Sequence, residues 1–589
     1  MSTDAAETKA KEEPAKPKEP VKKISPVEKI KQASRFLMGS IDAELADPVD
    51  HFNSDNIQLL KFHGTYQQDD RDKRLELKKS GGGKAYQMMI RCRIPGGRMT
   101  SEQMLLQLDL CDELGDATLK ITTRQTLQLH GILKSDLRET INRINAMHIS
   151  TLAACGDVNR NIMCCPAKRV GGVYDELNRF TDELTDALAP QTPAYHELWI
   201  TDPETGEKQL AGGGEPVNVE EPLYGPTYLP RKFKAGICLP EDNCIDVYTQ
   251  DLGYIAVVRD GTIMGYNVTV GGGMGTTPAN KKTFPALAKR LAFVTPDQAI
   301  EVAKAVIMVQ RDNGNRADRK VARMKYLIAN WGIDKFREEV QKVCGFELEP
   351  CTEDDVTDVD DHMGWQEQGD GKWSYGLSVE NGRLYDNDER QIKAGFREVC
   401  KTFGREIRLT GNQSLMFCDI EDHEKDQLME IFRRHNIRTT EDTSSIRRWS
   451  MACVALPTCG LAITESERRL PSVIDALEGP LAQLGLSNER FTLRMTGCPN
   501  GCARPYNADL ALVGKAKNKY TLFAGGGWLG NRLAYIYKDL VPEEQVVSEI
   551  IGIFAAFKAN RDGNESLGSF CTRVGGEALA SLAEAAPKP

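Results

Sequence analysis

Long apolar runs are missing from this sequence of 589 residues. No stretch of about 18 consecutive apolar residues occurs, so no membrane-spanning helix is expected. No P-loop and no dinucleotide-binding glycine fingerprint occurs, so the chain is not expected to bind NADPH or a flavin itself. The net charge of −10 gives no support to a general nucleic-acid binder. Because no signal peptide is recognisable, we expect the 16 cysteines to be reduced and the protein to be cytoplasmic.

The length predicts several domains or one large duplicated body. Residues 1–25 are rich in Lys, Glu, Ala and Pro, which predicts a disordered tail. Residues 119–132 (LKITTRQTLQLHGI) are similar to residues 407–420 (IRLTGNQSLMFCDI), and each segment is followed by a predicted helix. A repeat at this separation indicates a duplicated domain rather than a solenoid.

Local patterns predict several elements. Residues 57–63 are expected to form a strand. Residues 100–114 are amphipathic and should form a helix with Thr100 or Ser101 as its N-cap. The helical region 464–484 should be broken into shorter pieces by Pro471 and Pro480.

Four cysteines near the C-terminus form two spaced pairs. Cys453 and Cys459 are separated by five residues, and Cys498 and Cys502 by the three residues Pro-Asn-Gly. Four thiolates suit a soft metal, either zinc or an iron–sulfur cluster. These gaps are wider than those of a zinc ribbon, which favours an object larger than one ion. A set of four buried structural cysteines is the alternative.

The segment from Cys453 to Cys459, together with the run TGCPNGCARP at 496–505, resembles the sirohaem and 4Fe-4S signature of sulfite and nitrite reductases. The resemblance extends over nearly the whole chain from about residue 55, and it is greatest to assimilatory sulfite reductases. It implies that all four cysteines hold the cluster and that Cys502 also ligates the sirohaem iron. Gly460 departs from the proline common after the second cysteine, which leaves the local loop shape open.

The resemblance and the repeat together predict an α+β fold with pseudo-two-fold duplicated, ferredoxin-like halves. The expected segments are the tail at 1–25, a first ferredoxin-like half at 55–150 and a first sirohaem- and substrate-binding domain at 154–340. A second ferredoxin-like half follows at 345–445, and a domain that ligates the 4Fe-4S cluster and the sirohaem at 446–580.

Cationic residues on predicted strands point to an oxyanion substrate. Lys232 and Lys234 lie on a predicted strand, where alternation would place both on one face and Phe233 on the other. Any one such charge alone would be interpreted as a solvated surface group. The resemblance implies that Arg91, Arg160, Lys232 and Lys234 face the substrate.

Sirohaem carries eight carboxylates, so its pocket should be rich in cationic and amide donors. The positions that match the family are Arg124, Gln128, His130, Arg231 and Asn500. A core or surface histidine is the alternative for His130.

The function expected from the resemblance is a six-electron reduction of sulfite to sulfide. Reduction of nitrite to ammonia on the same scaffold is the alternative, and Lys234 favours sulfite because nitrite reductases of the family often carry Asn there. A non-catalytic iron–sulfur or zinc protein is the alternative from another class. Electrons must come from a partner protein, either a ferredoxin or an NADPH-dependent flavoprotein subunit, and both remain open.

Overall fold

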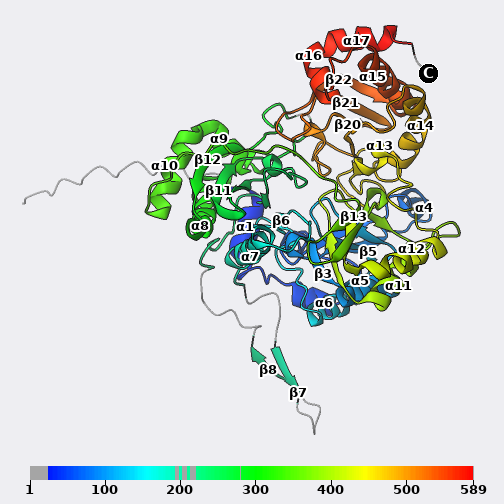
Figure 1. The fold of residues 1–589 in the computed structure, drawn as a ribbon. Helices are drawn as coiled ribbons and strands as arrows, with labels where there is room; N and C mark the ends of the chain where they lie inside the picture. The colour runs from blue at the N-terminus through cyan, green and yellow to red at the C-terminus, as the bar shows by residue number, and fades with distance from the viewer. Residues whose placement is uncertain (1–23, 193–197, 202–207, 213–220, 279, 588–589) are drawn as a thin grey trace, which may run out of the picture.

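The computed structural model describes residues 24–192, 198–201, 208–212, 221–278 and 280–587. Apart from its last two residues, the predicted tail at 1–25 lies outside this described part. In Figure 1 the first and second ferredoxin-like halves, blue and yellow-green, lie together, with the orange and red C-terminal sheet above them and the green middle sheet beside them.

Two five-stranded sheets form the ferredoxin-like halves, and each takes one short strand from the other half. The first sheet has the order β1 (Thr65–Asp69), β2 (Tyr86–Arg91), β5 (Leu127–Ile132), β4 (Leu119–Ile121) and β15 (Arg383–Leu384). The second has the order β13 (Gly364–Glu367), β14 (Lys372–Leu377), β17 (Leu415–Glu421), β16 (Glu406–Leu409) and β3 (Arg98–Thr100). A single hydrophobic core contains residues of both halves, so the two halves pack as one body.

The exchanged strands occupy equivalent places. Arg383 of β15 pairs with Lys120 of β4, and Arg98 of β3 pairs with Arg408 of β16, both antiparallel. Because each exchanged strand hydrogen-bonds across the pseudo-two-fold axis, neither half is complete without the other. The duplication expected from the repeated segment is therefore present as an interlocked pair.

Two further sheets share one topology. The middle sheet has the order β12 (Lys289–Val294), β11 (Thr262–Val270), β10 (Leu252–Arg259), β9 (Ala235–Cys238) and β6 (Met163–Cys164). The C-terminal sheet has the order β18 (Met451–Ala452), β19 (Leu493–Thr496), β20 (Leu510–Ala516), β21 (Lys519–Ala524) and β22 (Tyr535–Pro542). In each sheet the first three strands along the chain are parallel and the last two antiparallel. The duplication therefore includes these domains. A two-stranded sheet of β7 (Leu198–Thr201) and β8 (Lys208–Gly212) completes the described strands.

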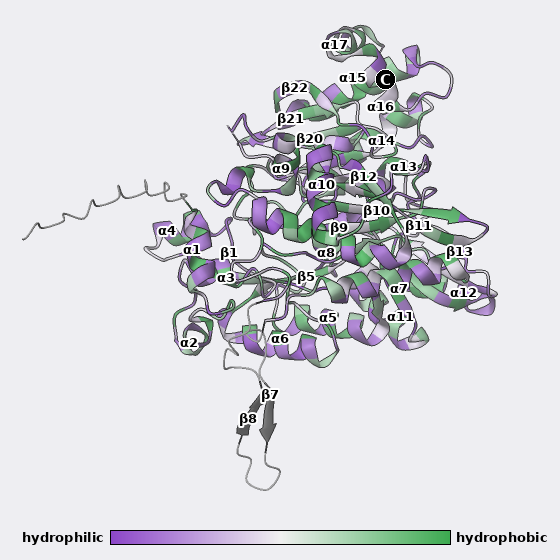
Figure 2. Ribbon diagram, turned by 90° about the vertical axis from the view of Figure 1, so that its left-hand side faces the viewer, coloured by the Kyte–Doolittle hydropathy of each residue, from purple (hydrophilic) through white to green (hydrophobic). Residues whose placement is uncertain are grey.

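Helices cover the outer faces of the sheets. Figure 2 shows hydrophilic and hydrophobic residues alternating along helices such as α6 and α11, as expected of helices that bury one face. The helices are α1 (Pro26–Ala33), α2 (Ile41–Ala46), α3 (Asn56–Leu59), α4 (Arg74–Lys79), α5 (Ser101–Glu113), α6 (Leu137–Ala146), α7 (Gly172–Ala187), α8 (Pro296–Asn313), α9 (Met324–Trp331), α10 (Ile333–Cys344), α11 (Ile392–Phe403), α12 (Lys425–Arg434), α13 (Ser445–Arg448), α14 (Leu470–Gln483), α15 (Val546–Asn560), α16 (Leu567–Val574) and α17 (Gly576–Ala585). Among the described residues, no helix combines the length and the apolar character that a membrane crossing requires.

The predicted helix at 100–114 is confirmed. Its N-cap is Thr100, whose Oγ1 accepts from the Gln103 amide at 3.1 Å, while the Gln103 side chain accepts from the Thr100 amide at 3.0 Å. This reciprocal capping box satisfies two amides that the first helical turn leaves without partners.

Three local predictions are wrong. Residues 56–59 form helix α3 rather than a strand, because the Asn53 side chain accepts from the Asn56 amide and starts a helical turn. Helix α14 continues through Pro480, since it buries Leu477 and Leu481 in the C-terminal core. Residues 231–234 make one isolated bridge, Phe233 to Asn159, and strand β9 begins only at Ala235.

Candidate active site

The two cysteine pairs lie on loops that leave neighbouring parallel strands. Strands β18 and β19 pair in parallel, with Ala452 opposite Met495. Cys453 directly follows β18, and Cys498 lies just beyond the end of β19. The carboxyl ends of adjacent parallel strands meet at one edge of a sheet, so the fold brings the two loops together. The amide of Gly497 donates to Cys453 Sγ at 3.4 Å, which joins the two loops directly.

The four thiols act on one another electrostatically. Burial and the nearby Cys502 and Cys459 thiols together raise the pKa of Cys498 to about 11. Burial also raises the pKa of Cys453 and of Cys459, and Cys502 again adds to both. Thiols that oppose each other's ionisation become thiolates when a bound cation supplies the compensating charge. The group therefore has the chemistry of a metal-binding site.

The spacing of these thiols does not fit a single zinc ion. In the described part of the chain, no three of them have all their sulfur atoms within 4.8 Å of one another. Around one zinc ion, Zn–S bonds of about 2.3 Å place neighbouring sulfurs about 3.8 Å apart. The more open arrangement favours a cluster over one ion.

Residues of the first half hold the cysteine loops. Arg71 Nη1 donates to the carbonyls of Cys459 and Ala462, at 3.1 and 2.7 Å. Thr123 Oγ1 donates to the carbonyl of Cys502 at 3.0 Å. The Thr123 contact places the turn between β4 and β5 against Cys502. The family resemblance implies that this cysteine links the two cofactors.

The lysine pair lies in a group of cations beside Cys502. Burial and, after it, the charges of Arg231, Arg160 and Arg323 together lower the pKa of Lys232 to about 7, although Cys502 acts in the opposite direction. Burial likewise lowers the pKa of Lys234, helped by Arg124 and Lys232. Although residues 231–234 are not a regular strand, Phe233 is buried at 1% exposure while Lys232 and Lys234 are partly exposed, a pattern compatible with alternation. The structure thus brings together Arg124, Arg160, Arg231, Lys232 and Lys234 and joins them to the cysteine site.

Arg91 belongs to the edge of this cationic group. It lies opposite Gln128 in the pairing of β2 with β5, and its Nη1 lies 2.7 Å from Cys155 Sγ. With the Gln128 amide oxygen facing it, Arg91 Nε donates to Gln128 at 2.8 Å. Burial raises the pKa of the Tyr66 hydroxyl, while the charges of Arg160 and Arg91 lower it, so Tyr66 lies among these arginines. Gln128 therefore orients Arg91.

Two of the remaining predicted residues lie elsewhere along the site. Asn500 lies in the second cysteine loop and donates from Nδ2 to Cys498 Sγ at 3.4 Å. His130 is buried on β5, and burial followed by the charges of Arg383 and Lys120 keeps its pKa well below the ordinary value. His130 is therefore neutral, and the charges that act on it are those of Arg383, Lys120 and Arg91.

Sequence reasoning missed Arg323 and Tyr66. Arg323 lowers the pKa of both lysines and of Arg124, and it is held by an ion pair to Asp251 with Nη2–Oδ2 2.5 Å. The basic run from Arg319 to Arg323, just before α9, was a signal for Arg323. Tyr66 begins a segment, 66–72, that resembles the family, but its role in the site is apparent only from the pairing of β1 with β2.

The residues present fit a large polyanionic cofactor. Within the described residues, Nε of Arg124, Nε of Arg160 and both side-chain amide atoms of Asn159 are buried without a hydrogen-bond partner. Both ring nitrogens of His130 are in the same state. Buried donors without partners cost free energy that a carboxylate-bearing ligand would recover. A porphyrin-like group with several carboxylates matches this donor set.

Comparisons with known proteins agree with the geometry. The model of the nitrite and sulphite reductase 4Fe-4S domain matches residues 155–348, and that of the nitrite/sulfite reductase ferredoxin-like half domain matches residues 81–147 and 366–435. The first of these ranges contains none of the four cysteines, which lie in the second copy of the duplicated sheet.

Among curated proteins, the chain is 44% identical to the sulfite reductase [NADPH] hemoprotein beta-component of Paenibacillus sp., over 92% of this chain and 94% of that protein. It is 43% identical to the sulfite reductase [ferredoxin] of Synechococcus elongatus, over 94% and 90% of the two chains. The solved structure of the Mycobacterium tuberculosis NirA protein superposes with a TM-score of 0.76 at 23% identity, over 95% of this chain and 98% of that one. That likeness supports the fold.

Proposed function

Because this chain belongs to the nitrite and sulfite reductase family, we propose that it is an assimilatory sulfite reductase that reduces sulfite to sulfide. The observation that carries the proposal is the position of Lys232 and Lys234. Both lie in a partly buried group of cations, and the Cys502 thiol of the four-cysteine site contributes to the pKa of Lys232. Side chains that could bind an anion therefore lie close to the cysteines proposed for electron transfer.

We propose, from the resemblance to the family, which residues would hold the cofactors, and the geometry is compatible with that assignment. Cys453, Cys459, Cys498 and Cys502 would hold a 4Fe-4S cluster, with the Cys502 thiolate also ligating the iron of a sirohaem. The carboxylates of the sirohaem would be met by Arg124, Gln128, His130, Arg231 and Asn500. When bound, the two groups supply single electrons and a site for the sulfur atom of sulfite.

The protein's own residues would bind the oxyanion and supply protons. Arg91 and Arg160 present planar guanidinium groups, which bind two oxygens of an oxyanion at once. Sulfite loses its three oxygens as water, so protons must reach the oxygens as they leave. Lys232, with its pKa lowered to about 7, can release a proton near neutral pH, and Lys234 lies beside it.

The choice between sulfite and nitrite depends on Lys234. Sulfite has more oxygens and more negative charge than nitrite, so a second ammonium group favours it. We therefore expect reduction of nitrite to ammonia to be the slower reaction of the same site.

The electron donor is a partner protein, either a ferredoxin or an NADPH-dependent flavoprotein subunit. Relatives that use each donor are almost equally similar to this chain, at 43% and 44% identity. We propose a cytoplasmic location, because all 16 cysteines are free, as expected of a reducing compartment.

A chemical-donor assay tests the proposed function. Purified holoenzyme is given reduced viologen and either sulfite or nitrite, and sulfide and ammonia are measured. We expect a higher kcat/KM for sulfite. Lys234→Asn should move the ratio of the two kcat/KM values toward nitrite by about tenfold, a difference of about 1.4 kcal/mol. The exposed Lys281→Asn is the matched control and should leave the ratio unchanged. Ammonia formation with little sulfide from the unmodified enzyme would refute the proposal.

A further inference from the structure

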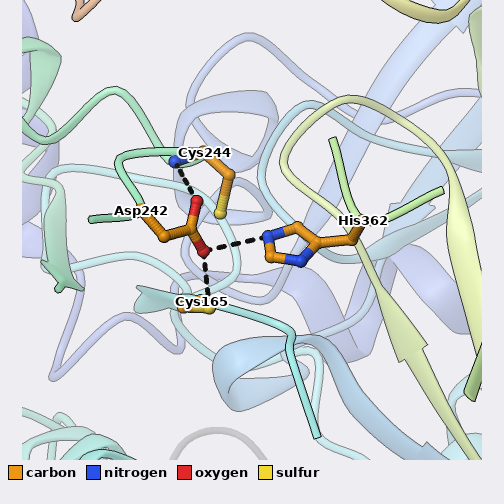
Figure 3. Close-up of side chains that lie close together, drawn as sticks. All are labelled: Cys165, Asp242, Cys244 and His362. Atoms are coloured by element: carbon orange, nitrogen blue, oxygen red, sulfur yellow. Dashed lines mark hydrogen bonds and ion pairs between the residues drawn. The ribbon is translucent and has the colours of Figure 1, made fainter. Parts of the chain in front are cut away.

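A second group of candidate metal ligands lies in the first copy of the duplicated sheet. Cys165, Asp242, Cys244 and His362 each offer one potential ligand atom, and these atoms all lie within 4.8 Å of one another. Figure 3 shows the Asp242 carboxylate at the centre of the four side chains. Its Oδ2 lies 2.6 Å from Cys165 Sγ and 3.0 Å from His362 Nε2. All four residues are buried, the most exposed at 6%.

This group occupies the pseudo-symmetric counterpart of the four-cysteine site. Cys165 directly follows β6 as Cys453 directly follows β18, and β6 pairs in parallel with β9 as β18 does with β19. Cys244 lies as far beyond the end of β9 as Cys502 lies beyond the end of β19. The two sites therefore arise from the same two loops of the repeated fold.

Backbone conformation supports the equivalence of the loops. Asp246 follows Cys244 by two residues, and Arg504 follows Cys502 by two residues. Both adopt the left-handed conformation, with φ of 52° and 48°. Each precedes a short 3₁₀ helix, η3 (Val247–Thr249) and η7 (Pro505–Asn507). The two residues pair with each other across the repeat, with Arg504 Nε 2.5 Å from Asp246 Oδ2.

We infer that Cys165, Asp242, Cys244 and His362 bind one zinc ion. Two thiolates, one imidazole and one carboxylate are ligands that zinc takes in tetrahedral protein sites. The ligand atoms lie closer together than those of the four cysteines, as one ion requires and a cluster does not allow. The loop has Pro240 at the position equivalent to Cys498, and His362, from the segment before β13, completes the set of four instead.

The surroundings orient the ligands. Asp242 Oδ1 accepts from the amides of Cys244 and Asp360, at 3.1 and 3.3 Å, which leaves Oδ2 facing the other three residues. The Asp360 carboxylate lies 3.9 Å from His362 Nδ1, on the side of the ring away from Asp242. A carboxylate behind a ligating imidazole is the usual way to fix its orientation.

The backbone of His362 is also held for this purpose. Its φ is 60°, in the left-handed region, which costs a residue other than glycine about 1–3 kcal/mol. The amide of His362 donates to Asp360 Oδ1 at 3.0 Å and fixes this conformation. Such a strained conformation, which aims a buried imidazole at two thiols and a carboxylate, is consistent with a ligand role.

The ion would be structural. Four protein ligands in a buried position leave no open coordination site for a substrate. On binding, the two thiols, and the imidazole where it is protonated, release their protons to solvent. Zinc would thereby fix the loop that carries Asp246, whose carboxylate binds Arg494 and Arg504 close to Cys502.

Metal analysis of the purified holoenzyme tests the inference without any activity assay, so its outcome is independent of the proposed function. We expect about one zinc per chain in addition to iron. Zinc-edge X-ray absorption, which ignores iron, should show two sulfur ligands at about 2.3 Å and two nitrogen or oxygen ligands at about 2.0–2.2 Å.

Variants assign the ion to this site. Cys165→Ser/Cys244→Ser should lower zinc to less than about a tenth of an ion per chain, and His362→Gln should lower it at least about tenfold. The matched control is Cys400→Ser, which alters a buried cysteine outside the group and should keep the zinc. Unmodified protein that contains no zinc, and takes up none when incubated with Zn²⁺ under reducing conditions, would overturn the inference. A disulfide between Cys165 and Cys244 in the native protein would also overturn it.

Discussion

A buried ion network between the halves allows a sharp test of how the cysteine site is supported. Glu467 Oε1 lies 2.6 Å from Arg383 Nη2, and the other carboxylate oxygen contacts Lys120 Nζ. Lys120 and Arg383 lie on β4 and β15, which pair across the halves, and the amide of Glu467 donates to the Cys453 carbonyl at 3.2 Å. Glu467 thus binds both halves through its carboxylate and the first cysteine loop through its amide.

The structure sets the size of the effect of Glu467→Gln. The Lys120 side chain is only 2% exposed and Glu467 only 11%, so the substitution leaves a buried ammonium without its counter-charge. Removing one partner of a buried pair costs about 3–5 kcal/mol. Because glutamine keeps one acceptor oxygen, we expect about 3 kcal/mol. Glu465→Gln is the matched control: its partner Arg468 is 43% exposed, and such pairs contribute about 0.2–1 kcal/mol.

Amide hydrogen exchange measures the local loss of stability that Glu467→Gln causes. About 3 kcal/mol corresponds to roughly a hundredfold faster exchange in peptides containing β4 and β15. Glu465→Gln should change that exchange by less than about fivefold. Lys120→Met in the Glu467→Gln background should recover much of the loss, because it removes the unpaired charge. Equal exchange in Glu467→Gln and Glu465→Gln would refute the reasoning.

The effect should also depend on pH. Burial opposes ionisation of Glu467, but the charges of Lys120 and Arg383 outweigh it and hold its pKa below the ordinary value of 4.5. The stabilisation is therefore fully present above pH 4.5 and is lost as the pH falls through the lowered pKa. The difference between Glu467→Gln and the unmodified protein should shrink only below about pH 4.5.

Two further predictions concern the cysteine loops. Arg71→Ala removes both hydrogen bonds to the first cysteine loop, so the cluster absorbance should be lost several-fold faster in air. Lys73→Ala, at an exposed position, is the control and should not change the rate. Equal rates for the two variants would show that Arg71 does not hold the loop. Gly497→Ala should lower cluster occupancy, because a Cβ at this position would lie 2.6 Å from the Ala455 Cβ and from the Thr464 carbonyl oxygen. A Cβ at Gly460 would meet nothing within 4 Å, so Gly460→Ala should keep full occupancy. Iron and sulfide analysis measures the occupancy of both variants.

Much of the site could be predicted from the sequence because chemistry was concentrated in short motifs. The four cysteines identified their own loops, and the cations at 231–234 gathered beside them even though a regular strand does not carry them. The local alternation of Lys232, Phe233 and Lys234 requires only an extended chain, and the burial of Phe233 enforces it.

The parts that could not be predicted depend on contacts distant in sequence. The exchange of β3 and β15 leaves no local pattern, since each strand spans only two or three residues. Pro480 indicates a helix end by local rules, but burial of the apolar face of α14 outweighs the lost hydrogen bond. Cys165 and Cys244 looked like ordinary reduced thiols, because the four candidate ligands come from three segments distant in sequence, at 165, 242–244 and 362.

The duplication explains why the four-cysteine site and the proposed zinc site would be coupled. Equivalent loops face each other across the pseudo-two-fold axis, and Asp246 of one loop forms an ion pair with Arg504 at the equivalent position of the other. Both side chains are buried, at 8% and 6% exposure, so loss of Asp246 would leave the charge of Arg504 buried without its acidic partner. The position of Arg504 therefore depends on an ordered loop around Asp246. Arg504 donates to the Thr123 carbonyl at 2.7 Å, and Thr123 Oγ1 in turn donates to the Cys502 carbonyl. A change that loosens the first loop should reach Cys502 through these contacts, without altering any thiol of the four-cysteine site.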